Sequence, residues 1–258
     1  MEQIIAVATD AAKEAGAILK ELFADRMKRY EMKNAHDIVA EADLKSEAII
    51  LGRIKDAFPD HAILSEEAGE NGKESEYKWI VDPLDGTINF SRGITEFSVS
   101  IAVSRNDELV FALVYEPVSD RLFVAEKGKG ATVNGAIIRV SDERNLVNTL
   151  LATDNTSNIT NRIRNFRLLE KVCANVRHVR IFGSSALHLA RIAIGEIDAY
   201  YKIDCNYWDN AAGILILREA GGIVTDMSGA YISPKSDTIV ATNGSVHEEL
   251  LKLLNVAD

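Results

Sequence analysis

The amino-acid sequence predicts a mixed fold whose first half is of the α+β class and whose second half is α/β. Apolar residues recur at helical spacing near the start of the chain, and an alternating, β-branched pattern runs from Phe97 to Val140. After the polar stretch 153–161, helical and strand patterns alternate, which is typical of an α/β unit. With 258 residues, the chain is long enough for two closely packed halves in one compact unit. We expect these halves to comprise residues 1–145 and 146–258.

The first half begins with helices and continues with strands. Apolar periodicity predicts two helices, and Pro59 and Asp60 stop the second. Two short apolar strands follow, and each delivers carboxylates at its end. Alternation punctuated by Gly and Asn-Asp turns then predicts antiparallel hairpins. The expected elements are helices over 4–22 and about 43–58, strands over 62–64 and 79–81, and hairpins from 97 to 140.

The second half alternates between the two kinds of element. Its helical stretches show apolar periodicity, and its strands are short and rich in β-branched or aromatic residues. The expected elements are a helix from about 163, a strand at 177–181, a helix from Ser184, strands at 197–202 and 222–225 around a helix at 208–220, and a last helix after Asn243.

Charge and composition exclude several classes of partner. The formal net charge of -10 opposes loose binding to nucleic acid or to an anionic membrane surface. The two cysteines, Cys173 and Cys205, form neither a disulfide framework nor a C-x-x-C metal motif. The first residues lack the basic and apolar regions of a secretory signal, and no apolar run approaches the roughly 20 residues that span a bilayer. We therefore expect a cytoplasmic protein.

The segment from Asp82 to Gly86 carries two carboxylates three residues apart, directly after a buried strand. Pro83 fixes one backbone angle and Gly86 permits a tight turn, so Asp82 and Asp85 can converge with the carbonyl of Leu84. Such an oxygen-rich cluster suits magnesium, because close carboxylates repel one another unless a cation or raised pKa values neutralise them. The alternative interpretation is an ordinary surface turn, since Asp, Pro and Gly are common turn residues.

Four segments in matching order resemble the inositol monophosphatase family over nearly the whole chain. Together they are far more specific than one short motif. The resemblance implies a layered αβαβα sandwich of the inositol monophosphatase and fructose-1,6-bisphosphatase type, acting as a magnesium-dependent phosphatase. The matching segments are Asp82–Phe90 (DPLDGTINF), Trp208–Gly213 (WDNAAG), the acidic pair Glu66-Glu67, and the upstream segment Asp37–Asp43.

The same resemblance implies roles for individual residues. Two or three magnesium ions would be held by the carboxylates of Glu66, Asp82, Asp85 and Asp209 and by the carbonyl of Leu84. Thr87 and Glu66 would orient the attacking water, and Asp43 would assist through an outer ion or its water. The substrate would contact Asp85, Gly86, Thr87, Ser184, Ser185, Lys202 and Asp209.

Three of these positions also have simpler structural interpretations. Ser184 follows a strand and precedes an apolar helix, so it can cap that helix as well as lie near an anion. Asp209 at a helix start is favourable without any metal, because it complements the helix dipole. Its neighbour Trp208 is expected to pack in the core.

Lys202 departs from the family pattern. Inositol-hydrolysing relatives often carry a carboxylate at the aligned position, where it accepts hydrogen bonds from sugar hydroxyls, and a lysine cannot do so. Lys202 could bind a second phosphate, Asp204 could take over the hydroxyl contact, or Lys202 could be exposed without a role.

The sequence thus predicts a magnesium-dependent sugar or polyol phosphatase with inositol monophosphate as the leading substrate. Fructose 1,6-bisphosphate and a 3′-phosphoadenosine nucleotide are the alternatives that Lys202 suggests. A catalytically silent binding or regulatory protein is a more distant alternative. The resemblance further implies a homodimer and inhibition by lithium.

Overall fold

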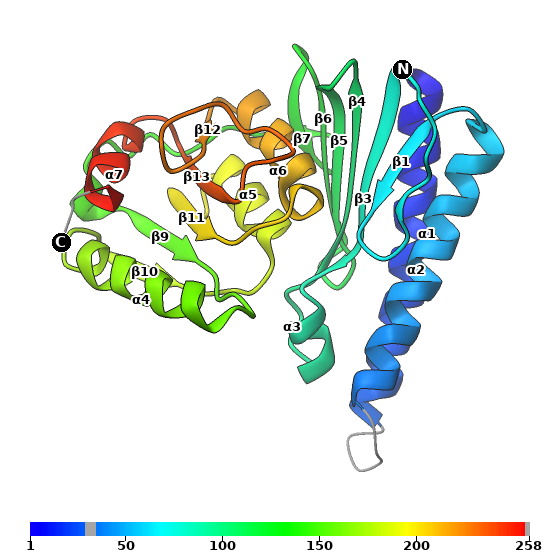
Figure 1. Ribbon diagram of the computed structural model, residues 1–258, viewed down its shortest axis with the longest axis horizontal. Helices are drawn as coiled ribbons and strands as arrows, with labels where there is room; N and C mark the ends of the chain where they lie inside the picture. Colours follow the sequence, from blue (N-terminus) through cyan, green and yellow to red (C-terminus); the bar gives the residue numbers. More distant parts are fainter. Residues whose placement is uncertain (29–34, 256–258) are drawn as a thin grey trace.

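The structure is a computed structural model that describes the backbone of residues 1–28 and 35–255 and the side chains of 1–24 and 40–255. Its elements form five layers (Figure 1). Helices α1 (Glu2–Lys28) and α2 (Ala35–Ala57) cover one face of a first sheet. Helices α5 (Ser185–Ala193) and α6 (Tyr207–Glu219) lie between this sheet and a second one. The outer face of the second sheet carries α4 (Ile159–Cys173) and α7 (His247–Leu254).

The first sheet has the strand order β2-β1-β3-β4-β5-β6-β7-β8 within the described residues. Only β1 and β3 pair in parallel, and the remaining pairs are antiparallel. The strands are β1 (Ala62–Ser65), β2 (Gly69–Glu70), β3 (Tyr77–Asp85), β4 (Ser98–Arg105), β5 (Glu108–Glu116), β6 (Arg121–Glu126), β7 (Gly130–Val133) and β8 (Ala136–Ile137).

The second sheet has the order β10-β9-β11-β13-β12. Strands β9, β10 and β11 run parallel, whereas β13 is antiparallel to both of its neighbours. A short 3-10 turn, Leu146–Asn148, precedes it, so the expected boundary at 145/146 falls between the sheets and stays a prediction. The strands are β9 (Leu150–Thr153), β10 (His178–Arg180), β11 (Ala199–Ile203), β12 (Ile223–Thr225) and β13 (Thr238–Thr242).

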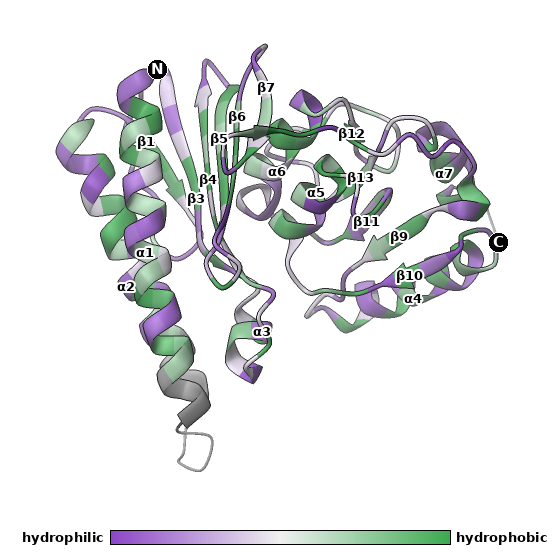
Figure 2. Cartoon of the chain, turned by 180° about the vertical axis from the view of Figure 1, so that it is seen from behind, coloured by the Kyte–Doolittle hydropathy of each residue, from purple (hydrophilic) through white to green (hydrophobic). Residues whose placement is uncertain are grey.

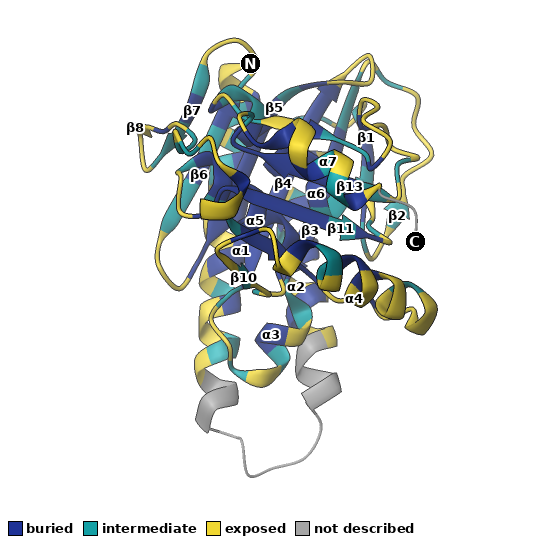
Figure 3. Ribbon diagram, turned by 90° about the vertical axis from the view of Figure 1, so that its left-hand side faces the viewer, coloured by how far each residue is buried: buried dark blue, intermediate teal, exposed yellow. Residues whose placement is uncertain are grey.

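Alternation along the strands divides the interior into separate apolar cores. In β3, Trp79 and Val81 face α1 and α2, whereas Ile80 between them faces α5 and α6. Because both faces of this sheet are covered, its central strands read as nearly continuous apolar runs. Figure 2 shows the apolar residues gathered in the strands and on the inner faces of the helices, and Figure 3 shows the strands buried and the loops exposed. The layered fold implied by the sequence is confirmed.

Several boundaries differ from the sequence expectation. Helix α2 begins at Ala35 and not near Asp43, and α4 begins at Ile159, where Asn158 accepts hydrogen bonds from the first free N–H groups. Strands β9 and β13 and the short helix α3 (Thr87–Arg92) were not expected from the sequence. Each is too short for its apolar periodicity to stand out.

The expectation that the strand at 79–81 ends before a proline turn is wrong. Strand β3 continues to Asp85, with a register shift against β4 between Asp82 and Asp85. A bulge accommodates Pro83, which has no N–H to give to the ladder. Ser46 of α2 donates a hydrogen bond of 2.7 Å to the carbonyl oxygen of Pro83. The bulge therefore turns the chain without leaving this carbonyl unpaired.

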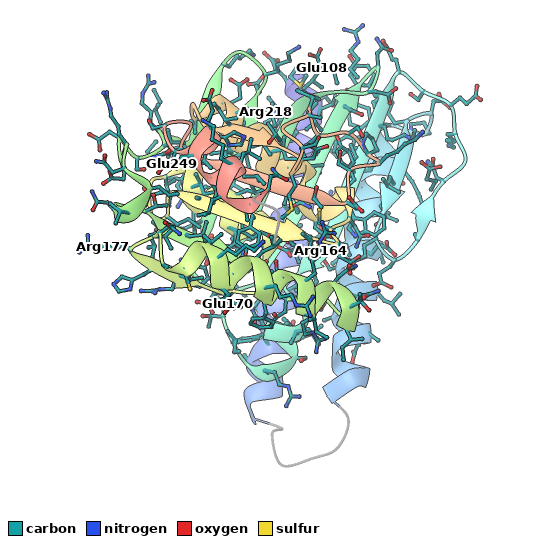
Figure 4. The ribbon with its side chains drawn as sticks, turned by 60° about the vertical axis from the view of Figure 1, so that its left-hand side comes forward. Glu108, Arg164, Glu170, Arg177, Arg218 and Glu249 are labelled. Atoms are coloured by element: carbon teal, nitrogen blue, oxygen red, sulfur yellow. The ribbon has the colours of Figure 1, made fainter. Side chains whose placement is uncertain are left out.

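Among the described helices, none combines the length and the apolar character that crossing a membrane requires. The charged side chains labelled in Figure 4, such as Arg164 and Glu170 on α4, lie on the outside of the molecule.

Candidate functional site

A cavity of about 500 Å³ lies where the two halves of the chain meet. The ends of β3 and β9 lead into it, and α3, α5 and α6 begin beside it. Ligands of open α/β sheets bind at such strand ends, and the free N–H groups of helix starts favour anions there. The lining includes Glu66, Asp82, Leu84, Asp85, Gly86, Thr87, Asp154, Thr156, Gly183, Ser185, Lys202, Asp204 and Asp209.

The bulge in β3 directs the Asp82–Gly86 segment toward this cavity. The N–H of Leu84 donates a 3.1 Å hydrogen bond to Oδ1 of Asp82, which fixes that carboxyl group. The side chain of Leu84 packs in the core beneath α1 and α2, so its main chain is the part available to the cavity. Gly86 has φ of 92°, and a Cβ there would lie 2.7 Å from the carbonyl oxygen of Glu96. Since Asp82 and Asp85 are buried, the surface-turn interpretation is wrong.

The carboxylate of Asp85 lies at the N-terminus of α5. It accepts hydrogen bonds from the hydroxyl of Ser184 and from the backbone N–H groups of Ser185 and Ala186, at 3.2 and 3.0 Å for the two amides. Ser98 of β4 donates a further bond of 3.3 Å. An anion bonded in this way is stabilised by the free amides and the dipole of the helix. Asp85 therefore joins the two halves of the chain across the cavity.

Burial and mutual repulsion raise the pKa values of these carboxyl groups. Burial raises the pKa of Asp82 well above its usual range, and the charges of Glu66, Asp85 and Asp209 raise it further. Burial also raises the pKa of Glu66 to about 7, although Asp82 donates a hydrogen bond to it. For Asp85, burial raises the pKa to about 6, against the hydrogen bond from Ser184. We call Glu66, Asp82, Asp85 and Asp209 the acidic cluster.

Asp43 lies close enough to Glu66 for their charges to interact, but it does not line the cavity. It is buried on α2, and its Oδ1 has no hydrogen-bond partner among the described residues. Burial and the nearby charges of Glu66, Glu67 and Glu47 raise its pKa to about 8. A buried carboxyl oxygen without a hydrogen-bond partner destabilises the fold by its desolvation free energy, so it indicates a place for a proton, a water molecule or a cation. Of the upstream segment 37–43, the side chains of 37–39 lie outside the described residues.

Lys202 of β11 reaches the opposite side of the cavity. Its Nζ lies 3.3 Å from Oδ2 of Asp209 and donates a 3.0 Å hydrogen bond to Oγ of Ser185. Ser185 is in turn 3.1 Å from the hydroxyl of Tyr200, which donates a 3.0 Å bond to Asp154. We call Lys202, Ser185, Tyr200 and Asp154 the Lys202 chain. Because the Lys202 side chain is only 13% exposed, the expectation of a solvent-exposed lysine is wrong.

Asp154 was missed by the sequence analysis. It follows β9 directly, is buried, and accepts a 2.9 Å hydrogen bond from the N–H of Gly183. His188 of α5 lies 3.1 Å from its other oxygen. Burial would raise the pKa of Asp154, but His188 and Lys202 outweigh it and the pKa is lowered. In the sequence, Asp154 is one of several polar residues in the stretch 153–161, and nothing there marks it out because β9 was not expected.

The simpler interpretations of Ser184, Trp208 and Asp209 are confirmed. Ser184 caps α5 by accepting a 3.3 Å hydrogen bond from the N–H of Leu187. Trp208 packs against the core around α5 and α6, and Asp209 lies in the first turn of α6. Asp204 lines the cavity but is held by the hydroxyl of Thr156.

The acidic cluster fits a hard divalent cation. Among the described residues, no three carboxylate, imidazole or thiol side chains are gathered closely enough to form a metal centre. Nevertheless, the carboxylates that line the cavity are oxygen donors only, and the pKa values of Glu66, Asp82 and Asp85 are all raised. Mg²⁺ prefers such ligands, and its charge would remove the repulsion among them.

Comparison with known proteins gives a consistent result. A model described as the inositol monophosphatase family matches residues 1–257. Inositol monophosphatase 2 from Solanum lycopersicum is 38% identical over 266 residues, covering 100% of both chains. Nus factor SuhB from Escherichia coli (strain K12) is 37% identical and covers 97% of this chain and 95% of its own. The structure of an inositol monophosphatase from Anabaena (Nostoc) superposes with a TM-score of 0.87 at 35% identity, covering 98% of this chain and 95% of the other.

Proposed function

Because the chain belongs to the inositol monophosphatase family, we propose that it hydrolyses a phosphate monoester of a small polyol or sugar. Inositol monophosphate is the first expected substrate. The observation that carries the proposal is the convergence of Glu66, Asp82, Asp85 and Asp209 on one cavity beside the starts of α5 and α6.

Two or three Mg²⁺ ions would be held by the acidic cluster and by the carbonyl of Leu84. The bound ions would acidify a water molecule and neutralise the phosphate oxygens and the leaving alkoxide. The raised pKa values of Glu66, Asp82 and Asp85 support this assignment, because the charged carboxylates repel one another until a proton or a cation neutralises them.

The chain's own residues would then position the reactants. Thr87 and Glu66 would hold the attacking water, and Asp43 would act on the same side through an outer ion or its water. Asp85 is already fixed by the α5 N-terminus, so its second role as a substrate contact requires no reorganisation. Gly86, Ser184 and Ser185 would complete the substrate contacts at the helix starts.

The proposal is tested by measuring phosphate release with Mg²⁺ and inositol 1-phosphate, fructose 1,6-bisphosphate or 3′-phosphoadenosine 5′-phosphate. We expect turnover that disappears in excess chelator and in the Asp82→Asn variant. Full activity in chelator after removal of metal would contradict the metal dependence. Mg²⁺ binding without turnover of any ester would favour the catalytically silent alternative.

The remaining expectations concern partners and setting. The exclusion of nucleic acid rests on the net charge of -10 alone, and a relative at 37% identity is named a Nus factor. A homodimer, inhibition by lithium and a cytoplasmic location likewise stay predictions. Sedimentation analysis and a lithium titration of the Mg²⁺-dependent activity test the first two directly.

A further inference from the structure

We propose that Lys202 makes the cavity select phosphate monoesters that carry a second anionic group, either another phosphate or a carboxylate. This inference rests on the proposed function and specifies its substrate class. It follows from how the Lys202 chain holds the ammonium group and from which of its donors remain free.

The Lys202 chain has one consistent direction of hydrogen bonding. Lysine Nζ carries donors only, so Lys202 donates to Oγ of Ser185 at 3.0 Å. Oγ of Ser185 and the hydroxyl of Tyr200 lie 3.1 Å apart, and Tyr200 donates to Asp154 at 3.0 Å. Because the Tyr200 hydroxyl donates its proton to Asp154, the hydroxyl of Ser185 must donate to the oxygen of Tyr200. A lone pair of the Ser185 oxygen then accepts the hydrogen bond from Lys202. The carboxylate of Asp154 thereby holds the ammonium group of Lys202 through two intervening hydroxyl groups, those of Tyr200 and Ser185.

The anchor is rigid because its members are buried. Tyr200 is fully buried and stacks on the ring of His188, with ring centroids 4.6 Å apart and planes inclined by 8°. Ser185 and Asp154 are buried as well. The N–H of Gly183 donates to Oδ1 of Asp154, and Nδ1 of His188 lies 3.1 Å from Oδ2, the oxygen that accepts from Tyr200. A long lysine side chain normally loses considerable rotamer freedom when it binds a ligand. Here the fold has already restricted that freedom.

One donor of the Lys202 ammonium remains for a ligand. Nζ carries three N–H donors, and in the described part of the chain Ser185 and Asp209 account for two. Lys202 also lines the cavity. A substrate hydroxyl would accept this donor as a neutral group, whereas a phosphate or carboxylate oxygen would also bring a negative charge next to a largely buried ammonium group. The free donor therefore favours an anionic oxygen over a hydroxyl at the same place.

Two matched pairs of esters test the inference. Inositol 1-phosphate and inositol 1,4-bisphosphate differ by a second phosphate, and glycerol 2-phosphate and 2-phosphoglycerate differ by a carboxylate in place of a hydroxymethyl group. For each pair, the ratio of kcat/KM for the more anionic ester to that for its partner is measured in the wild type and in Lys202→Met. We expect at least one ratio to fall by about tenfold to a hundredfold in the variant.

A matched control is Lys129→Met, which removes an exposed lysine paired with Glu126 on a surface hairpin and should leave both ratios unchanged. A fall confined to the first pair identifies a second phosphate, a fall confined to the second identifies a carboxylate, and a fall in both indicates any anionic oxygen. Unchanged ratios in Lys202→Met overturn the inference.

The inference can fail separately from the proposed function. If the wild type hydrolyses none of the four esters, the proposed function fails. The inference is then tested by calorimetry with Ca²⁺ present, as the ratio of the dissociation constants of the two members of each pair in the wild type and in Lys202→Met. Tyr200→Phe provides a second variant in case Lys202→Met does not fold. This variant removes the hydroxyl that links Ser185 to Asp154 but keeps the ammonium group of Lys202. The KM for the anionic ester should therefore rise several-fold with little change in kcat. Equal KM changes for both members of a pair would count against a positioning role.

Discussion

On the side of the cavity formed by β3, carboxyl groups face one another, whereas on the side formed by β11 a lysine reaches its partners through hydroxyl groups. Burial and mutual repulsion raise the pKa values of Asp82 and Glu66, and the Oδ1 of Asp43 has no hydrogen-bond partner among the described residues. By contrast, each link from Lys202 to Asp154 joins a donor to an acceptor. Lys202 lies close to Asp209 and Asp85, so Glu66, Asp82 and Asp43 are the carboxyl groups that need a proton or a cation for neutralisation.

The two sides should therefore respond in opposite ways to the loss of a charged group. Removing a carboxyl group from the acidic cluster should relieve repulsion in the metal-free protein, although it would weaken the proposed ion site. Removing the ammonium group from the Lys202 chain should leave Asp154 and Asp209 without their cation.

The largest effect is expected for Asp82→Asn. We predict a loss of phosphatase activity of at least about a hundredfold. Mutation of a residue that only hydrogen-bonds to a metal ligand already lowers metal affinity or activity by about 10–100-fold. The same variant should unfold at a higher temperature than the wild type in excess chelator, because a buried carboxyl group with a raised pKa is gone. Asp60→Asn, at an exposed turn, is the control and should change neither quantity. Lower metal-free stability of Asp82→Asn would contradict the repulsive character of the cluster.

The next effect is a pH dependence of the metal-free protein. The pKa of Glu66 is raised from 4.5 to about 7, so between these values the folded chain binds more protons than the unfolded chain. Stability from this group is therefore complete below about pH 4.5 and is lost as the pH rises through about 7, by about 3 kcal/mol. Urea unfolding in chelator at pH 5 and pH 8 measures the loss. Mg²⁺ should stabilise the protein more at pH 8, and equal stabilisation at both values would argue against the cluster as the ion site.

A smaller effect of opposite sign is predicted for Lys202→Met. The free energy of unfolding in chelator should fall by about 2 kcal/mol, which is less than for a fully buried pair because both partners are slightly exposed. Denaturant unfolding measures the change, and Lys129→Met should stay within about 0.5 kcal/mol of the wild type. A variant as stable as the wild type would mean that the ammonium group does not balance Asp154 and Asp209.

The smallest effect is predicted for Ser184→Ala. Ser184 donates a hydrogen bond to Asp85 of the acidic cluster and caps α5, the helix that carries Ser185 of the Lys202 chain. The variant loses the cap of α5 and one hydrogen bond to Asp85, so we expect a destabilisation of about 1 kcal/mol. It should also raise the pKa of Asp85, because that bond favours the charged carboxylate. Thermal unfolding measures the first change, and NMR titration of the Asp85 carboxyl carbon measures the second. An unshifted Asp85 pKa would show that the two backbone amides suffice.

Most of the fold could be predicted because its signals are local. Helical periodicity located α1, and alternation located the hairpins that became β4 to β8. Among the short elements, β1, β10 and β12 were expected, whereas β9, β13 and α3 were not, since four to six residues alone do not define a period. The extension of β3 through Pro83 depended on a bulge and on Ser46 from another helix, and neither is visible in the segment itself.

The sequence by itself determined the family, the layered architecture and the set of carboxylates around the Asp82 motif, because contiguous residues that follow a strand must emerge at one place. Only the tertiary structure decided what surrounds Lys202. Its partners Ser185, Tyr200, Asp154 and Asp209 come from α5, β11, the end of β9 and α6, and packing of these elements brings the five side chains together. Hydrogen bonds between residues up to 46 positions apart leave no periodicity in the sequence. The environment of a charge, unlike the charge itself, is a property of the folded chain.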